Sequence, residues 1–119
     1  MANSVKEYQE RFVEISKARF GEDYSNHRKL IKHLAGEVVE LQEAITETLG
    51  LTMAKRTRII GGEIADCIAC CMVAADILGV DLDKALEGKI KEKSGQENEA
   101  FLQGAKLITN TEETSLLKE

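Results

Sequence analysis

The sequence predicts an all-α protein built as a bundle of four to five helices. Its 119 residues include no proline, and they are rich in Glu, Lys, Leu, Ile and Ala, which favour helix. Apolar side chains also recur at spacings of three and four residues, as on one face of a helix. A chain of this length with 43% hydrophobic residues suits a single domain with a modest core. We expect that domain to span residues 1–108, with a flexible tail over 109–119.

The first half of the chain predicts two helices separated by a turn. Apolar residues at helical intervals predict the first over Val5–Phe20, and Gly21 follows as a stop signal. Residues 21–26 have the composition of a turn. The second helix has the clearest pattern, since apolar residues repeat over Leu30–Leu49 until Gly50.

A third helix is predicted to begin within Thr52–Arg56 and to end at Gly79. Apolar residues surround it on nearly every side over Ile59–Val80, which predicts a central helix. Gly61 and Gly62 interrupt it, each at a cost of about 1 kcal/mol relative to alanine. Close packing of another backbone would explain these glycines, and a local kink is the alternative.

The remaining sequence predicts one further helix and allows another. Asp81 or Asp83 can cap a helix that runs over Leu82–Ile90 and frays within 94–99. Residues 101–108 could form a short extra helix or pack against a neighbouring subunit.

Composition and charge exclude several classes of protein. A net charge of -5 disfavours binding to nucleic acid polymers, which need a basic surface. The longest apolar run, Cys67–Ala75, is far shorter than the roughly 20 residues that span a bilayer, so no membrane association is expected. No signal peptide is evident, and three cysteines in one short stretch predict core thiols in a reducing cytoplasm rather than disulfides or a metal site.

Two short acidic segments, one on the second and one on the third predicted helix, share the same sequence pattern. Gly36-Glu37-Val38-Val39-Glu40 matches Gly62-Glu63-Ile64-Ala65-Asp66 in pattern. Carboxylates three residues apart lie on one helix face, where they can share a cation and otherwise repel each other. One such pair alone is typical of a solvated helix face.

The second pair changes this interpretation because its helix has almost no polar face. Buried carboxylates must be paired, protonated or bound to metal, and no basic residue occurs between Ile59 and Val80. Carboxylate oxygens select hard cations, so we expect Mg²⁺, with Mn²⁺ as a substitute. Mg²⁺ bound in this way commonly also contacts substrate phosphates.

Over residues 30–93 the chain resembles the MazG-like nucleotide pyrophosphohydrolases of the all-α NTP pyrophosphatase superfamily. The resemblance rests on the ExxE and ExxD helices and on the segment from Leu78 to Lys89, a short turn into a lysine-bearing helix. It implies Mg²⁺-dependent hydrolysis of a nucleoside triphosphate to its monophosphate and pyrophosphate, by a homodimer or homotetramer. The implied metal ligands are Glu37, Glu40, Glu63 and Asp66.

The resemblance and the chemistry also imply roles for individual side chains. Glu37 or Glu40 would act as the catalytic base, and the sequence leaves the choice between them open. Lys89 and Lys93 would bind the substrate phosphates. His33 lies one turn before Glu37 and could hydrogen-bond it, although a lone helical histidine is more often structural. Base stacking would fall to the aromatic residues Tyr8, Phe12, Phe20 and Tyr24.

Three other functions compete with this interpretation. A phosphoribosyl-ATP pyrophosphohydrolase would share the acidic helices and differ in substrate. A helical interaction module would have no catalytic activity. A ferritin-like di-iron protein is disfavoured, because neither histidine follows a glutamate by three residues.

Overall fold

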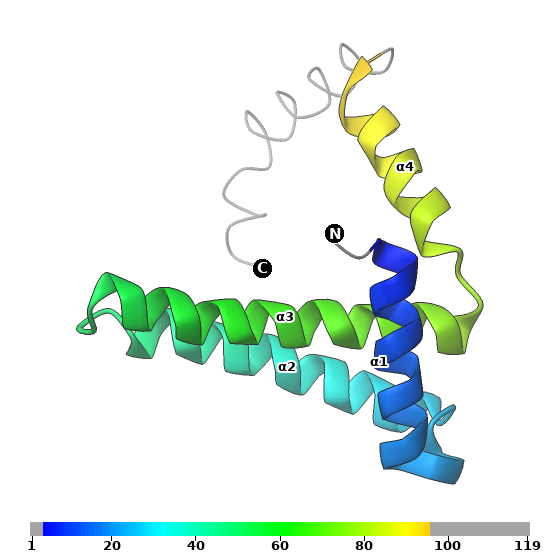
Figure 1. The fold of residues 1–119 in the computed structure, drawn as a ribbon, viewed down its shortest axis with the longest axis horizontal. Coiled ribbons are helices and arrows are strands. Elements are labelled where there is room, and N and C mark those ends of the chain that lie inside the picture. The colour runs from blue at the N-terminus through cyan, green and yellow to red at the C-terminus, as the bar shows by residue number, and fades with distance from the viewer. Residues whose placement is uncertain (1–3, 96–119) are drawn as a thin grey trace, which may run out of the picture. The chain divides into compact units, whose positions relative to one another are not determined.

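The computed structural model describes residues 4–95, and these form four α-helices and one 3₁₀ turn. The elements are α1 (Val5–Phe20), the 3₁₀ turn η1 (Gly21–Asp23), α2 (His27–Glu47), α3 (Met53–Leu78) and α4 (Leu82–Lys93) (Figure 1). No strand occurs within residues 4–95, which confirms the all-α prediction. The possible helix at 101–108 and the predicted tail at 109–119 lie outside the described residues.

Contacts divide the chain after Leu82, so that α1, α2 and α3 belong to one compact unit and α4 to another. None of the helices within residues 4–95 combines the length and the apolar character needed to cross a bilayer. The acidic pairs both lie in the first unit, one on α2 and one on α3.

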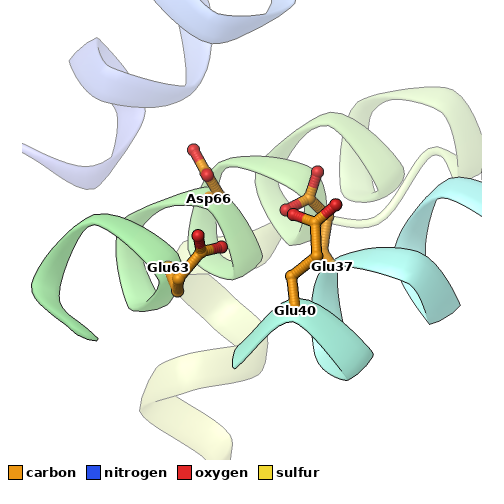
Figure 2. Close-up of side chains that lie close together, drawn as sticks. All are labelled: Glu37, Glu40, Glu63 and Asp66. Carbon is orange, nitrogen blue, oxygen red and sulfur yellow. The ribbon is translucent and has the colours of Figure 1, made fainter. Parts of the chain in front are cut away.

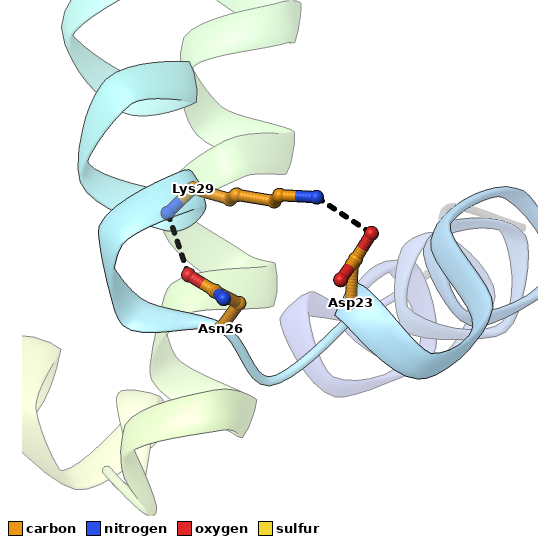
Figure 3. Close-up of polar contacts among 3 residues, drawn as sticks. All are labelled: Asp23, Asn26 and Lys29. Atoms are coloured by element: carbon orange, nitrogen blue, oxygen red, sulfur yellow. Dashed lines mark hydrogen bonds and ion pairs between the residues drawn. The ribbon is translucent and has the colours of Figure 1, made fainter.

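The helix boundaries follow from local capping. Ser4, Asn26 and Thr52 precede α1, α2 and α3, and each side-chain oxygen accepts a hydrogen bond from a backbone N–H of the first turn. At α2, Asn26 Oδ1 accepts from the Lys29 N–H at 3.0 Å (Figure 3). Gly79 ends α3 with φ of 71°, in the left-handed region that favours glycine.

Helices α2 and α3 form an antiparallel hairpin joined by residues 48–52, and α1 packs across α3 (Figure 1). The buried apolar side chains come from all three helices: Val13, Ala44, Cys70, Met72, Val73 and Ala75. Four of the six lie on α3, so this helix is the centre of the unit as the sequence predicts. The Gln9 side-chain amide donates to the Met72 carbonyl at 2.9 Å and ties α1 to α3.

A polar contact fixes the connection between α1 and α2 against α3. The Tyr24 hydroxyl donates to Asp76 Oδ2 at 2.7 Å. Burial, together with this hydrogen bond and the Asp76 charge, raises the pKa of Tyr24, so the phenol stays protonated and remains a donor. The contact helps to place the start of α2, and hence the first acidic pair, beside α3.

Two details of α3 differ from the sequence-based expectations. A Cβ built at Gly61 or Gly62 meets no atom of the described residues within 4 Å, so close backbone packing within residues 4–95 does not explain these glycines. The helix is also not enclosed by the described chain, because Ile64 and Ile68 remain 43% and 51% exposed. The apolar pattern alone does not show which part of the helix surface α1 and α2 cover.

Candidate metal centre

Four carboxylates from α2 and α3 meet at the middle of the hairpin. Glu37 and Glu40 project from α2 toward Glu63 and Asp66 of α3 (Figure 2). One oxygen from each residue can be chosen so that all four atoms lie within 4.8 Å of one another. The structure therefore brings together all four of the predicted metal ligands.

The two helices contribute to this acidic cluster in the same way. On each, the first residue of the pair, Glu37 or Glu63, is half-buried, and the second, Glu40 or Asp66, is exposed. Oε2 of Glu37 and Oε2 of Glu63 are both buried without a hydrogen-bond partner in the described residues. A buried oxygen that lacks a partner is costly unless a ligand completes its coordination.

Like charges dominate the electrostatics of the cluster. Among residues 4–95, no lysine or arginine forms an ion pair with any of the four carboxylates. Two unit charges about 5 Å apart repel by roughly 3 kcal/mol at an effective dielectric constant of about 20. The charge of Glu37 is the largest cause of a raised pKa at Glu40, followed by desolvation and then by Glu63 and Asp66. Proton uptake or a bound cation would relieve the repulsion.

The donor set fits a hard divalent cation. All four ligands offer carboxylate oxygens, which Mg²⁺ and Mn²⁺ prefer, whereas a soft metal would prefer sulfur or imidazole. The two unpartnered oxygens, which come from opposite helices, are suitable for such coordination. Glu37, Glu40, Glu63 and Asp66 could therefore hold a hard divalent cation.

His33 contacts the cluster from the side of α2. Its Nε2 lies 3.0 Å from Glu37 Oε1, and its ring lies 5.8 Å from that of Phe20. The predicted contact between His33 and Glu37 is therefore present. It orients one oxygen of Glu37 and leaves the other, Oε2, without a partner.

The raised pKa of Glu40 predicts how pH affects the metal-free protein. A folded-state pKa above the ordinary 4.5 contributes stability below that pH, and the contribution is lost as pH rises through the folded-state value. As pH rises from 4.5 through the folded-state pKa of Glu40, the Tm measured in EDTA should therefore fall more for wild type than for Glu40→Gln. Saturating Mg²⁺ should abolish the difference in slope, and parallel profiles in EDTA would contradict the assignment.

The cysteines near the cluster are thiols of unequal exposure. Cys67 donates to the Glu37 carbonyl at 3.4 Å, and desolvation, followed by nearby negative charge, raises its pKa. Burial raises the pKa of Cys70 to about 11, so it stays protonated at neutral pH. Cys71 is exposed, and the prediction that it belongs to the core is wrong. It lies on the part of α3 that α1 and α2 leave uncovered.

A cavity of about 220 Å³ opens beside the acidic cluster, between α1 and the hairpin. Glu37 and Asp66 form part of its wall, and Phe12 and Phe20 of α1 also line it. Of the four aromatic residues proposed to stack on a base, these two line the same cavity as Glu37 and Asp66. Tyr8 and Tyr24 do not line this cavity.

The predicted phosphate-binding lysines lie outside the unit that holds the cluster. Lys89 and Lys93 are on α4, where Lys89 Nζ lies 3.0 Å from Glu92 Oε2. Their role toward a substrate stays a prediction. Sequence reasoning missed Lys29 and Lys32, which line an open hollow beside Glu37 and Glu40. Their helical spacing from the first acidic pair was the available signal.

Comparison with known protein families, with characterised proteins and with solved structures finds no match to this chain.

Proposed function

We propose that this protein is a Mg²⁺-dependent nucleoside triphosphate pyrophosphohydrolase that releases a nucleoside monophosphate and pyrophosphate. The observation that carries the proposal is the pair of buried, unpartnered oxygens of Glu37 and Glu63 within a cluster of four carboxylates. A hard cation satisfies both oxygens and offsets the repulsion. Cleavage of a phosphoanhydride is a reaction for which such a site is suited.

The carboxylates of the cluster would have two roles in hydrolysis, to hold the metal and to accept a proton. Bound Mg²⁺ would supply positive charge to the phosphate oxygens and would polarise water. The oxygen of a water molecule attacks the α-phosphorus, the bond to the α–β bridging oxygen breaks, and pyrophosphate leaves. Glu37 or Glu40 would accept the proton of that water, and Glu40 is the better candidate because it is exposed, whereas Glu37 is half-buried and contacts His33.

The cavity beside the cluster is suited to the nucleoside part of the substrate. It shares Glu37 and Asp66 with the acidic cluster and carries aromatic side chains farther along its wall. A base stacked on Phe12 or Phe20 would be held close to the carboxylates. The base would then lie against α1 and the reacting phosphate against the hairpin.

Membership of the MazG-like pyrophosphohydrolases and a homodimeric or homotetrameric state belong to the same proposal. The paired acidic motifs support the first. Exposed apolar residues on the hairpin support the second, since Ile31, Leu49 and Ile68 are 67%, 71% and 51% exposed. Three free cysteines are consistent with the cytoplasmic location that we propose.

The decisive experiment is a panel of NTPs, dNTPs and phosphoribosyl-ATP, each incubated with the protein in Mg²⁺, Mn²⁺ or EDTA. Chromatography of the products should show monophosphate and pyrophosphate in equal amounts with either metal and none with EDTA. Exclusive turnover of phosphoribosyl-ATP would identify the narrower enzyme. No turnover of any substrate would reject the enzymatic proposal and favour a helical interaction module.

A further inference from the structure

Beyond the acidic cluster itself, lysines lie on one side of it along α2 and further glutamates lie on the other. Toward the start of the helix lies an open hollow of about 450 Å³, the basic hollow, lined by Lys29, Lys32, His33, Gly36, Glu37 and Glu40. Toward the end of the helix lies another of about 420 Å³, the acidic hollow, whose charged lining is Glu40, Glu43, Glu47 and Glu63. The two hollows share Glu40.

We propose that the basic hollow binds the outer phosphates of a polyphosphate chain, those beyond the phosphorus that is attacked, and that Lys32 is their main contact. The identity of the ligand rests on the proposed function. The direction of the chain rests on the charges along α2: ammonium groups attract phosphate oxygens on one side, and carboxylates repel them on the other. The substrate therefore extends from the cluster toward the start of α2.

The two lysines differ in how available their charges are. Lys29 Nζ lies 2.6 Å from Asp23 Oδ2, and its backbone N–H donates to the Asn26 cap (Figure 3). Lys32 forms no ion pair with any residue from 4 to 95, and it is exposed. Because the charge of Lys29 is already shared with a carboxylate, Lys32 is the stronger partner for a phosphate.

The helical register leaves a clear path between Lys32 and the carboxylates. Lys32, Gly36 and Glu40 follow one another at four-residue intervals, so they lie on one face of α2. A Cβ built at Gly36 meets no atom of the described residues within 4 Å, so a side chain at this position would project into the hollow. Glycine therefore keeps the floor of the basic hollow open between the lysine and the acidic cluster.

Binding of inorganic tripolyphosphate tests this inference independently of the base and of catalysis. Calorimetry on the full chain in Mg²⁺ should show that Lys32→Gln weakens tripolyphosphate binding about tenfold, as expected for one lost charge-assisted contact. In the same variant, the affinity for inorganic phosphate should fall by less than about twofold, because a single phosphate does not extend beyond the cluster. Lys6→Gln, an exposed change on α1 away from the basic hollow, should alter neither affinity.

A second variant tests the direction of the chain. Glu43→Gln in the acidic hollow should change tripolyphosphate affinity by less than about twofold. The inference is overturned if wild type does not bind tripolyphosphate, if Lys32→Gln binds it as wild type does, or if Glu43→Gln has the larger effect. Nucleotide hydrolysis by wild type would persist if the basic hollow alone were wrong, whereas its absence from the substrate panel would reject the enzymatic function.

Discussion

Glu63→Gln is expected to lower nucleotide hydrolysis on the order of 1,000-fold and, at the same time, to stabilise the metal-free protein. The loss of activity is of the size seen when one preorganised electrostatic contact is removed. Stability should rise while activity falls, because the amide removes one negative charge from a cluster whose oxygens lie within 4.8 Å of one another. The thermal midpoint in EDTA should rise by roughly 4 °C for each kcal/mol of relieved repulsion.

The combination of effects separates a metal ligand from an ordinary structural residue. A structural glutamate would lose stability and activity together. Glu14→Gln on α1 is the matched control, since this exposed acid lies away from the cluster, and it should change neither quantity. Unchanged hydrolysis in Glu63→Gln would reject the proposed centre. A lower Tm in EDTA would show that other groups stabilise the Glu63 charge in the folded state.

Met72→Ala is expected to lower the free energy of unfolding by about 3 kcal/mol, the usual cost of removing a large apolar side chain from a core. Met72 is only 6% exposed and lies on α3, which packs against both α1 and α2. Its backbone carbonyl still accepts the hydrogen bond from Gln9 after the substitution, so the loss reports side-chain packing. Urea denaturation followed by circular dichroism measures it.

Met53→Ala is the control for this change because it removes the same side chain from α3 at a position that is 76% exposed. It should alter the free energy of unfolding by no more than about 0.5 kcal/mol. Similar losses at Met53 and Met72 would contradict the packing of the three helices. Proteins of this size have small net stabilities, so the Met72 variant should also populate unfolded chains at lower temperature.

The helix limits were predictable because they depend on local sequence, and the convergence of the acidic pairs was predictable from their spacing and from the short connection between their helices. A capping residue and a terminal glycine define α3, from Thr52 to Gly79. The three-residue spacing in each pair fixes one face of a helix, and the short connection at 48–52 brings the two helices together as a hairpin. The repeated sequence pattern around Glu37 and Glu63 therefore corresponds to two acidic pairs that lie together in the structure.

The surroundings of the cluster were harder to predict because they depend on how each helix is rotated against its neighbours. The apolar surface of α3 led us to expect Cys71 in the core and a close neighbour at Gly61, but the structure shows neither. The resemblance directed attention to α4 for phosphate binding. The helical spacing of Lys32 from the first acidic pair is visible in the sequence, but the hollow that it shares with Glu37 and Glu40 appears only in the packed structure.

The matched burial of the two acidic pairs implies that the centre has approximate two-fold symmetry. An antiparallel hairpin relates Glu37 to Glu63 and Glu40 to Asp66, with the inner members half-buried and the outer ones exposed. A cation on that axis would meet nearly the same ligands from either helix, so the carboxylates alone do not determine the direction in which a substrate binds. In the proposed reaction, the direction in which the substrate lies would then be set by groups that break the symmetry, and the unequal charges along α2 are such groups.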